Sequence, residues 1–190
     1  MTKIAIFASG SGTNAENLLK YFKNNQLANI TLVLSNNQHA RAIQRAKKHN
    51  VKTLVFSRKD LYETDYIVEI LKEKADFIIL AGFLWRIPKS LIEIFPNSIV
   101  NIHPALLPKY GGKGMYGMRV HETVKENEEK ETGITIHYVN ERYDEGNIIY
   151  QKKITITPEY SPKDIAAKIH LLEYKYFPRV IENLLKSDCN

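Results

Sequence analysis

Residues 3–15, KIAIFASGSGTNA, place a short apolar strand directly before a glycine-rich loop and the opening of a helix. At such a junction in a parallel sheet, free backbone N–H groups and the positive end of the helix dipole point outward together. Gly10 and Gly12 leave room for an anion to approach the backbone closely. The stretch therefore predicts an α/β fold with a phosphate-binding loop at the end of its first strand.

Apolar runs alternate with helical segments through the first half of the chain. Expected strands cover residues 3–9, 30–35, 53–57, 76–83 and 98–103, and expected helices cover residues 14–24, 41–50, 61–74 and 88–95. The strands are nearly continuous in apolar character, which is typical of a parallel sheet buried on both faces. The pattern predicts a doubly wound, Rossmann-like domain with a mostly parallel sheet and flanking helices.

The second half adds a helix at residues 118–127, two strands at residues 133–139 and 147–157, and a helical tail from Lys163. We expect Pro178 to interrupt that tail, because proline removes a helical hydrogen bond. No internal repeat or linker divides the sequence, so it predicts a single domain over residues 1–190.

The composition is that of a globular protein, with 44% hydrophobic and 25% charged residues in a chain of 190. The first apolar run is too short for a signal segment and no run approaches a membrane span, which indicates a cytoplasmic protein. The single cysteine, Cys189, has no partner for an internal disulfide and, next to the end of the sequence, is not expected to be a nucleophile.

The formal net charge of +6 is unevenly distributed, because no acidic residue occurs between Glu16 and Asp60. The excess favours an anionic partner, although a merely solvated basic surface is a simpler explanation. The basic residues are not interleaved with aromatic ones, so nucleic acid is not expected as a partner. A phosphorylated small substrate is sufficient to explain the excess of basic residues.

The spacing Gly10-x-Gly12-x-x-Ala15 also matches the dinucleotide-binding fingerprint, which makes an NAD-dependent oxidoreductase a competing interpretation. That site needs an acidic residue near the end of the second strand to bind the ribose hydroxyls. The strand here ends instead on Ser35, Asn36 and Asn37. An NADP site that uses Arg41 or Arg45 stays open as a weaker alternative.

Residues 98–110, SIVNIHPALLPKY, end an apolar strand on two polar side chains. Asn101 and His103 lie two apart and so share a face of the strand, and Pro104 keeps His103 extended. An amide and an imidazole aimed at one carbonyl oxygen can stabilise the charge of an acyl-transfer transition state. Asp144, in a later turn, could orient the imidazole. The alternative is a strand end whose polar groups are satisfied locally.

Other catalytic signatures are absent from the sequence. It contains no metal-ligand spacing and no serine-nucleophile elbow, so no metal is expected. None of the remaining histidines ends a strand beside a second polar residue, and we do not expect them to be catalytic. They are His39, His49, His121, His137 and His170.

The NIHPALLPKY run, the later D-E-G and the opening SGSGTN resemble the glycinamide ribonucleotide formyltransferase family, the folate-dependent enzymes of purine synthesis. The resemblance implies a one-carbon transferase that moves the formyl group of 10-formyltetrahydrofolate to the amine of glycinamide ribonucleotide. It implies catalytic roles for Asn101, His103 and Asp144, with Asp144 raising the pKa of a protonated His103. Its implied substrate-binding residues are Gly12, Thr13 and Asn14 for the phosphate and Glu173 for the ribose, with Lys59, Trp85, Arg86, Ile87, Pro88 and Asn101 for the folate.

The sequence departs from the family pattern at two places. One extra residue precedes Arg86, which changes the contacts expected of Trp85. The segment 111–117, GGKGMYG, replaces a proline-containing continuation. Other folate formyltransferases and formyltetrahydrofolate hydrolases share the Asn, His and Asp, but those enzymes generally carry an added domain. A non-enzymatic nucleotide-binding module is a further alternative, and the chain is expected to be a monomer or a homodimer.

Overall fold

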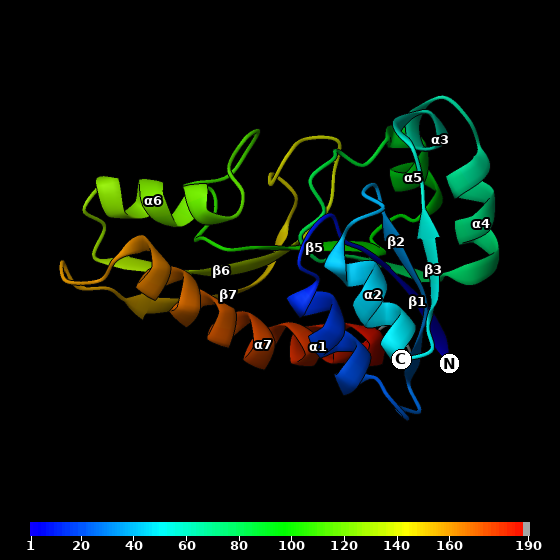
Figure 1. Cartoon of the computed structure of the whole chain (residues 1–190), viewed down its shortest axis with the longest axis horizontal. Coiled ribbons are helices and arrows are strands. Elements are labelled where there is room, and N and C mark those ends of the chain that lie inside the picture. The colour runs from blue at the N-terminus through cyan, green and yellow to red at the C-terminus, as the bar shows by residue number, and fades with distance from the viewer. Residues whose placement is uncertain (188–190) are drawn as a thin grey trace.

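The computed structural model describes residues 1–187, in which seven strands form one sheet (Figure 1). The sheet order is β3-β2-β1-β4-β5-β6-β7. The strands are β1 Thr2–Phe7, β2 Ala28–Ser35, β3 Lys52–Val55, β4 Phe77–Leu80, β5 Ile99–His103, β6 Glu131–Tyr138 and β7 Ile148–Thr155. The helices are α1 Thr13–Tyr21, α2 Arg41–Lys48, α3 Arg58–Tyr62, α4 Tyr66–Lys74, α5 Lys89–Ile94, α6 Met118–Glu126 and α7 Pro162–Ser187. The expectation for Cys189 lies outside the described residues.

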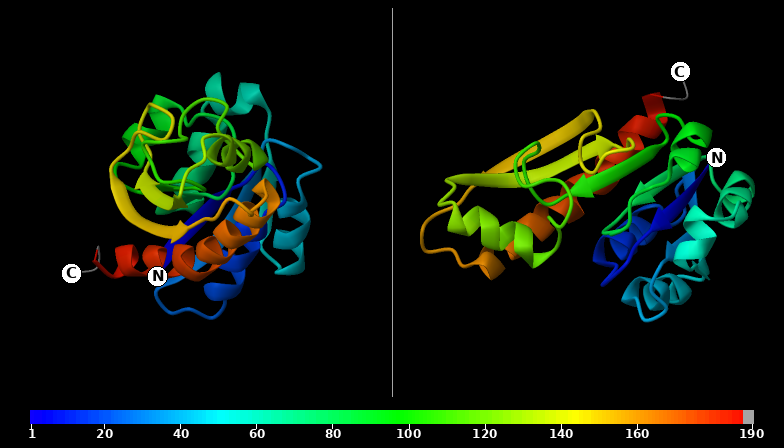
Figure 2. Two further views of the ribbon diagram at one scale, coloured as in Figure 1. Left: turned by 90° about the vertical axis from the view of Figure 1, so that its left-hand side faces the viewer. Right: turned by 90° about the horizontal axis from the view of Figure 1, so that it is seen from above.

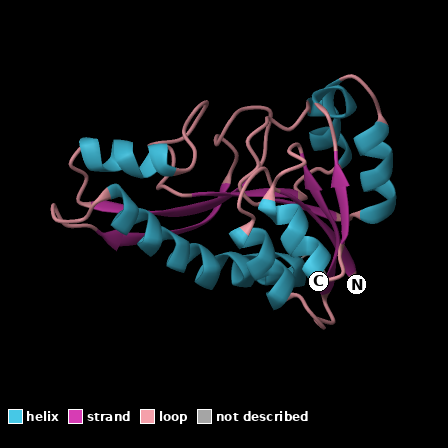
Figure 3. Cartoon of the chain, in the orientation of Figure 1, coloured by secondary structure: helices cyan, strands magenta, loops and turns pink. Residues whose placement is uncertain are grey.

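Helices cover both faces of the sheet, as the doubly wound prediction requires (Figures 2 and 3). Alternate residues of β1 belong to separate buried clusters, Ile4 and Ile6 to one and Ala5 and Phe7 to the other. The first cluster packs against α1, α2, α6 and α7, and the second against α3, α4 and α5. A strand buried on both sides explains why its sequence is apolar without alternation.

Strands β1 to β5 are parallel, whereas β6 pairs antiparallel with β5 and β7 antiparallel with β6. Parallel pairing directs the carboxyl ends of β1, β4 and β5 to one edge of the sheet. Antiparallel pairing brings the second half of β6 beside the same edge, with His137 opposite Asn101 and Thr135 opposite His103. The sheet thereby assembles residues that are far apart in sequence.

The helix expected over residues 61–74 is two helices. Ser57 and Asp60 form a capping box that starts α3 at Arg58, so the helix begins earlier than predicted. The Thr64 hydroxyl then donates to the Asp60 carbonyl and accepts from the Tyr66 backbone N–H. These bonds occupy backbone groups at the junction and separate α3 from α4.

The expected interruption at Pro178 does not occur, because α7 runs without a break from Pro162 to Ser187. Proline cannot donate to the carbonyl four residues earlier, which belongs to Tyr174. The Asn17 side chain on α1 donates to that carbonyl at 2.9 Å and replaces the missing bond. Although α7 has 26 residues, neither it nor another helix within residues 1–187 is long and apolar enough to cross a membrane.

Candidate active site

A cavity of about 680 Å³ opens at the carboxyl ends of the parallel strands. Its lining comes from the loop after β1, the residues after β4, the end of β5, residues 112–118, the loop between β6 and β7, and helices α6 and α7. This volume suits a small organic ligand, and open α/β sheets bind their ligands at this edge.

The glycine-rich loop lines one end of the cavity through residues 10–14. Gly12 has a φ of 69°, in the left-handed region, and starts α1 by accepting from the Glu16 backbone N–H. A Cβ at Gly12 would lie 2.4 Å from the Ala42 Cα. Gly12 is therefore required by the close packing of the loop on α2, a constraint that the sequence prediction of anion approach did not include.

Asn14 connects this loop to α7. Its side-chain Nδ2 donates to Glu173 Oε2 at 2.9 Å, and the same oxygen lies 2.9 Å from His170 Nδ1. The Glu173 side chain is buried, with 4% of its surface exposed. The hydrogen bond to Glu173 raises the pKa of His170 despite the opposing effect of burial. The predicted phosphate and ribose residues therefore lie together, and His170 joins them.

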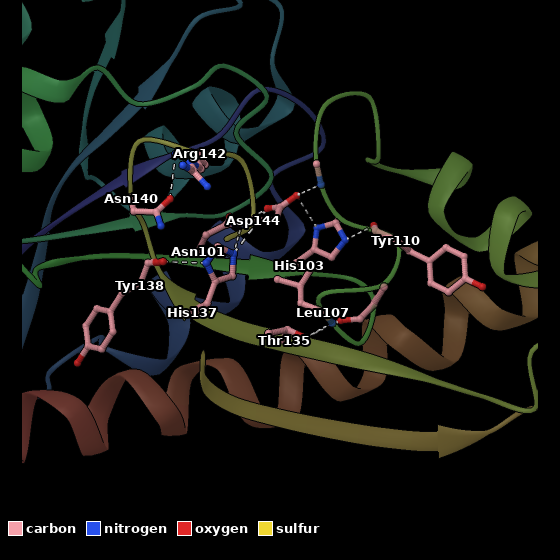
Figure 4. Close-up of polar contacts among 12 residues, drawn as sticks. Asn101, His103, Leu107, Tyr110, Thr135, His137, Tyr138, Asn140, Arg142 and Asp144 are labelled. Atoms are coloured by element: carbon pink, nitrogen blue, oxygen red, sulfur yellow. Dashed lines mark hydrogen bonds and ion pairs between the residues drawn. The ribbon is translucent and has the colours of Figure 1, made fainter. Parts of the chain in front are cut away.

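The three predicted catalytic residues converge at the other end of the cavity (Figure 4). Asn101 and His103 come from β5, and Asp144 comes from the loop after β6. The Asn101 Nδ2 donates to Asp144 Oδ1 at 3.4 Å, and His103 Nδ1 lies 3.6 Å from Asp144 Oδ2. The Gly112 backbone N–H also donates to Asp144 Oδ2, at 2.9 Å. The carboxylate is thus held between β5 and the segment 111–117.

Burial sets the charge of this cluster. It lowers the pKa of His103 and outweighs the upward effects of Asp144 and of the Tyr110 carbonyl. The expected net increase in the pKa of His103 is therefore wrong, although Asp144 acts in the expected direction. His103 Nε2 lies 2.7 Å from the Tyr110 carbonyl oxygen, which can only accept, so Nε2 bears a proton.

The pKa of Asp144 lies below its ordinary value. Burial of the carboxyl raises its pKa, but the polar groups around it, namely His137, His103 and the Gly112 N–H, together outweigh burial and lower the pKa. The side chain is therefore an anion at neutral pH, and it faces a neutral His103 ring.

His137, which the sequence does not predict to be catalytic, is part of this cluster. Its Nε2 lies 3.1 Å from Asn101 Nδ2 and 3.6 Å from Asp144 Oδ1. Its Nδ1 lies 2.8 Å from the Tyr138 carbonyl, which requires the proton on Nδ1 and leaves Nε2 to accept from Asn101 (Figure 4). The available signal was the pair Thr135 and His137, two polar residues that alternate with Ile134 and Ile136.

Thr135 fixes the turn that follows His103. Its hydroxyl donates to the Ala105 carbonyl at 2.7 Å and accepts from the Leu107 backbone N–H at 3.0 Å and from Gln151 Nε2 at 2.9 Å. All three groups are held by one buried side chain, which has no exposed surface. The turn is thereby held against β6, and this holds His103 in place at its start.

Apart from Asn101, the predicted folate residues do not line the cavity. Within residues 1–187, Phe83 and Leu84 line the cavity, whereas Lys59, Trp85, Arg86, Ile87 and Pro88 are not among its lining residues. The Trp85 ring packs edge-on against Phe56 and Phe83, and the Arg58 guanidinium lies 5.9 Å from its centroid. The indole of Trp85 thus lies in an aromatic cluster behind the cavity wall.

The competing dinucleotide interpretation finds little support at the end of β2. The Ser35 hydroxyl accepts from the Asn37 backbone N–H, and Asn37 Nδ2 donates to the Ser9 carbonyl. Arg45, one of the candidate NADP residues, is paired with Glu16 and donates to the Ser11 carbonyl.

Across residues 1–187, no group of three or more His, Cys, Asp or Glu side chains is arranged to hold a metal ion.

The fold and the cavity define an open α/β protein whose strand ends carry a glycine-rich loop and an amide–imidazole–carboxylate cluster, the arrangement of an acyl-transfer enzyme. Residues 2–181 match the model of the formyl transferase family. The chain belongs to the formyl transferase family.

Relatives and solved structures agree with this assignment. The chain is 35% identical over 191 residues to the phosphoribosylglycinamide formyltransferase of Bacillus subtilis, covering 97% of this chain and 95% of that protein. It is 34% identical to the chloroplastic phosphoribosylglycinamide formyltransferase of Arabidopsis thaliana, covering 94% of this chain and 64% of the relative. The crystal structure of glycinamide ribonucleotide transformylase 1 from Geobacillus kaustophilus superposes with a TM-score of 0.87 at 35% identity, covering 97% and 99% of the two chains. The chain thus spans less than two thirds of the plant relative.

Proposed function

We propose that this protein transfers the formyl group of 10-formyltetrahydrofolate to the amine of glycinamide ribonucleotide, a step of purine biosynthesis. One observation carries the proposal: the glycine-rich loop and the Asn101, His103 and Asp144 cluster open into the same cavity. The names of the relatives in Bacillus subtilis and Arabidopsis thaliana support the choice of substrates.

The acceptor binds with its phosphate at Gly12, Thr13 and Asn14 and its ribose at Glu173. Backbone N–H groups at the start of α1 are suited to a phosphate. The Glu173 carboxylate is a good acceptor for sugar hydroxyls, and Asn14 holds it in position. This orientation directs the acceptor's amine toward β5, where proximity to the formyl carbon accelerates the reaction.

The amine nitrogen attacks the formyl carbon, and the bond from that carbon to N10 of the folate then breaks. Asn101 Nδ2 and the His103 N–H stabilise the oxyanion that forms between the two steps. The His103 Nε2–H donates to the Tyr110 carbonyl oxygen in this structure, and it donates to the formyl oxygen instead when the substrates are bound. Asp144, an anion, accepts a proton from the attacking amine, and a proton is returned to N10 as tetrahydrofolate leaves. No covalent intermediate with the enzyme forms.

The folate binds on the side of the cavity lined by Phe83 and Leu84. The pterin ring contacts Asn101 in the cavity and extends past Leu84, beyond the cavity lining, toward the backbone and apolar groups of Arg86, Ile87 and Pro88. Lys59 is proposed to contact the acidic tail of the folate. Trp85 does not contact the folate directly and supports the cavity wall through its packing against Phe83.

The proposal includes a single domain over residues 1–190, a cytoplasmic location, a monomer or homodimer, and no requirement for a metal or nucleic acid. Cell fractionation tests the location, and analytical ultracentrifugation tests the oligomeric state. Full activity after treatment with a chelator is the expected result for metal, and its loss would remove that part of the proposal.

A purified-protein assay tests the reaction. Three reactions are compared. The first contains 10-formyltetrahydrofolate and glycinamide ribonucleotide, and the second contains 10-formyltetrahydrofolate with water as the only acceptor. In the third, NADPH replaces the folate. We expect formylated product only with glycinamide ribonucleotide, and its loss in Asp144→Asn. Equal release of formate without the acceptor would instead identify a hydrolase, and oxidation of NADPH would favour the dinucleotide interpretation.

A further inference from the structure

His121 is a buried imidazole that faces the cavity and has no assigned role. It lies on α6, its exposed surface is 3%, and it is among the residues that line the cavity. Its Nδ1 is enclosed and has no hydrogen-bond partner within residues 1–187, so the ring lines the cavity through its other atoms. A buried polar atom without a partner costs free energy, and such atoms usually have a partner in the functioning protein.

His121 lies between the two ends of the cavity. The charges of His170 and Glu173, at the sugar end, and of His103, at the catalytic end, all act on its ring. Helix α6 packs beside α7, which carries His170 and Glu173 (Figure 2). Because His121 lines the same cavity as the glycine-rich loop and His103, a ligand that extends from the loop to His103 passes its ring.

Burial, together with the nearby His170, lowers the pKa of His121 to about 4. At neutral pH the ring is uncharged, with one nitrogen that donates and one that accepts. Such a ring suits a neutral polar group of the ligand and is poorly suited to a phosphate. This separates His121 from the anion-binding loop and from the pair of His170 and Glu173.

We propose that His121 is a positioning residue that hydrogen-bonds the amide joining the sugar of the acceptor to its reacting amine. The inference rests on the proposed function, which places the sugar at Glu173 and the amine at His103. The amide is the neutral polar group between those two points. A bond to it fixes the last rotatable part of the acceptor and directs the amine at the formyl carbon.

Two variants separate this role from simple packing. His121→Phe keeps a planar ring and removes both hydrogen-bonding nitrogens, whereas His121→Gln keeps a neutral donor and acceptor. His39→Phe serves as the matched control, because His39 is exposed and is not among the cavity-lining residues. For each variant, kcat and KM are measured for both substrates, with the melting temperature.

We expect His121→Phe to lose about tenfold in kcat/KM for glycinamide ribonucleotide, the effect of one neutral hydrogen bond. The KM for 10-formyltetrahydrofolate should change less than twofold, and His121→Gln should recover part of the loss. The ratio of His121→Phe to wild-type activity should stay constant from pH 6 to 8, because the ring is neutral throughout. Unchanged kcat/KM in His121→Phe, or equal losses for both substrates, would overturn the proposal.

Acceptor analogues locate the bond. One analogue has a methylene in place of the amide N–H, and the other has a thioamide in place of the amide. At least one should lose about tenfold with the wild type and nothing further with His121→Phe, because the same bond is removed in both cases. If, for both analogues, the loss from the analogue and the loss from His121→Phe multiply, the two changes act independently, and this would contradict a hydrogen bond between His121 and the amide. An inactive wild-type protein would instead reject the proposed function itself, which is thereby tested separately.

Discussion

The cavity has two sides that differ in the side chains they carry: one is formed by lining residues that precede β5 in the sequence, and the other by β5 and the residues that follow it. The lining residues that precede β5, from the loop after β1 and the end of β4, include no ionisable side chain. From β5 onward the lining includes His103, Lys113, His121, Tyr143, Asp144, His170 and Glu173. The lining residues before β5 thus offer backbone, uncharged polar and apolar groups, whereas the ionisable groups come from β5 and the residues that follow it. Substitutions on the two sides should therefore affect different kinetic constants.

The largest losses of activity should come from the cluster formed by β5 and the loop after β6. We expect Asp144→Asn and His103→Ala each to lower kcat by on the order of a hundredfold or more, because each removes a group that acts in the transition state. Steady-state assays with circular dichroism as the folding control measure this. The double variant should lose much less than the product of the two, and near-wild-type turnover in either single variant would contradict the assigned roles.

His137 should come next. His137→Phe removes the acceptor for Asn101 and a partner of Asp144, so the orientation of both changes while both remain present. We expect kcat to fall by about tenfold with little change in either KM, since these groups act through orientation. A variant that raises the KM values and leaves kcat intact would show that His137 shapes the binding site instead.

On the loop side, Asn14→Ala should raise the KM for the phosphorylated acceptor by up to about tenfold and change kcat little. The substitution removes one hydrogen bond to Glu173 and leaves the backbone of the loop in place. Gly12→Val is a poorer probe, because its side chain would meet the backbone of α2 and destabilise the fold. An equal rise in the KM for the folate after Asn14→Ala would remove the distinction between the two sides.

The smallest effect should be at Trp85. Its ring packs against Phe56 and Phe83 and is not among the cavity-lining residues, so Trp85→Phe should change kcat/KM by less than about threefold. As the single tryptophan, it also reports on the wall of the cavity. A folate analogue should change its emission through Phe83, and the acceptor alone should change it less. Saturable folate binding by calorimetry with unchanged emission would place the pterin elsewhere.

Much of the fold could be predicted from the sequence, because buried parallel strands are continuous apolar runs. The same reasoning brought Asn101 and His103 to one strand face. Three features needed the structure. The pairing of His137 with Asn101 depends on the antiparallel register of β6, and the continuity of α7 at Pro178 depends on Asn17 from another helix. The net pKa of His103 depends on the balance between burial and Asp144, which no local pattern contains.

Substitutions on the two sides of the cavity are expected to affect different constants, binding on one side and turnover on the other. The sharpest test of this difference is calorimetric titration of glycinamide ribonucleotide into the wild type, Asp144→Asn and Asn14→Ala, with kcat measured for each protein. We predict that Asp144→Asn binds the acceptor within about threefold of the wild type while its kcat falls on the order of a hundredfold. Asn14→Ala should weaken binding by up to about tenfold with kcat nearly unchanged. Loss of binding in Asp144→Asn in proportion to its loss of turnover would contradict the account.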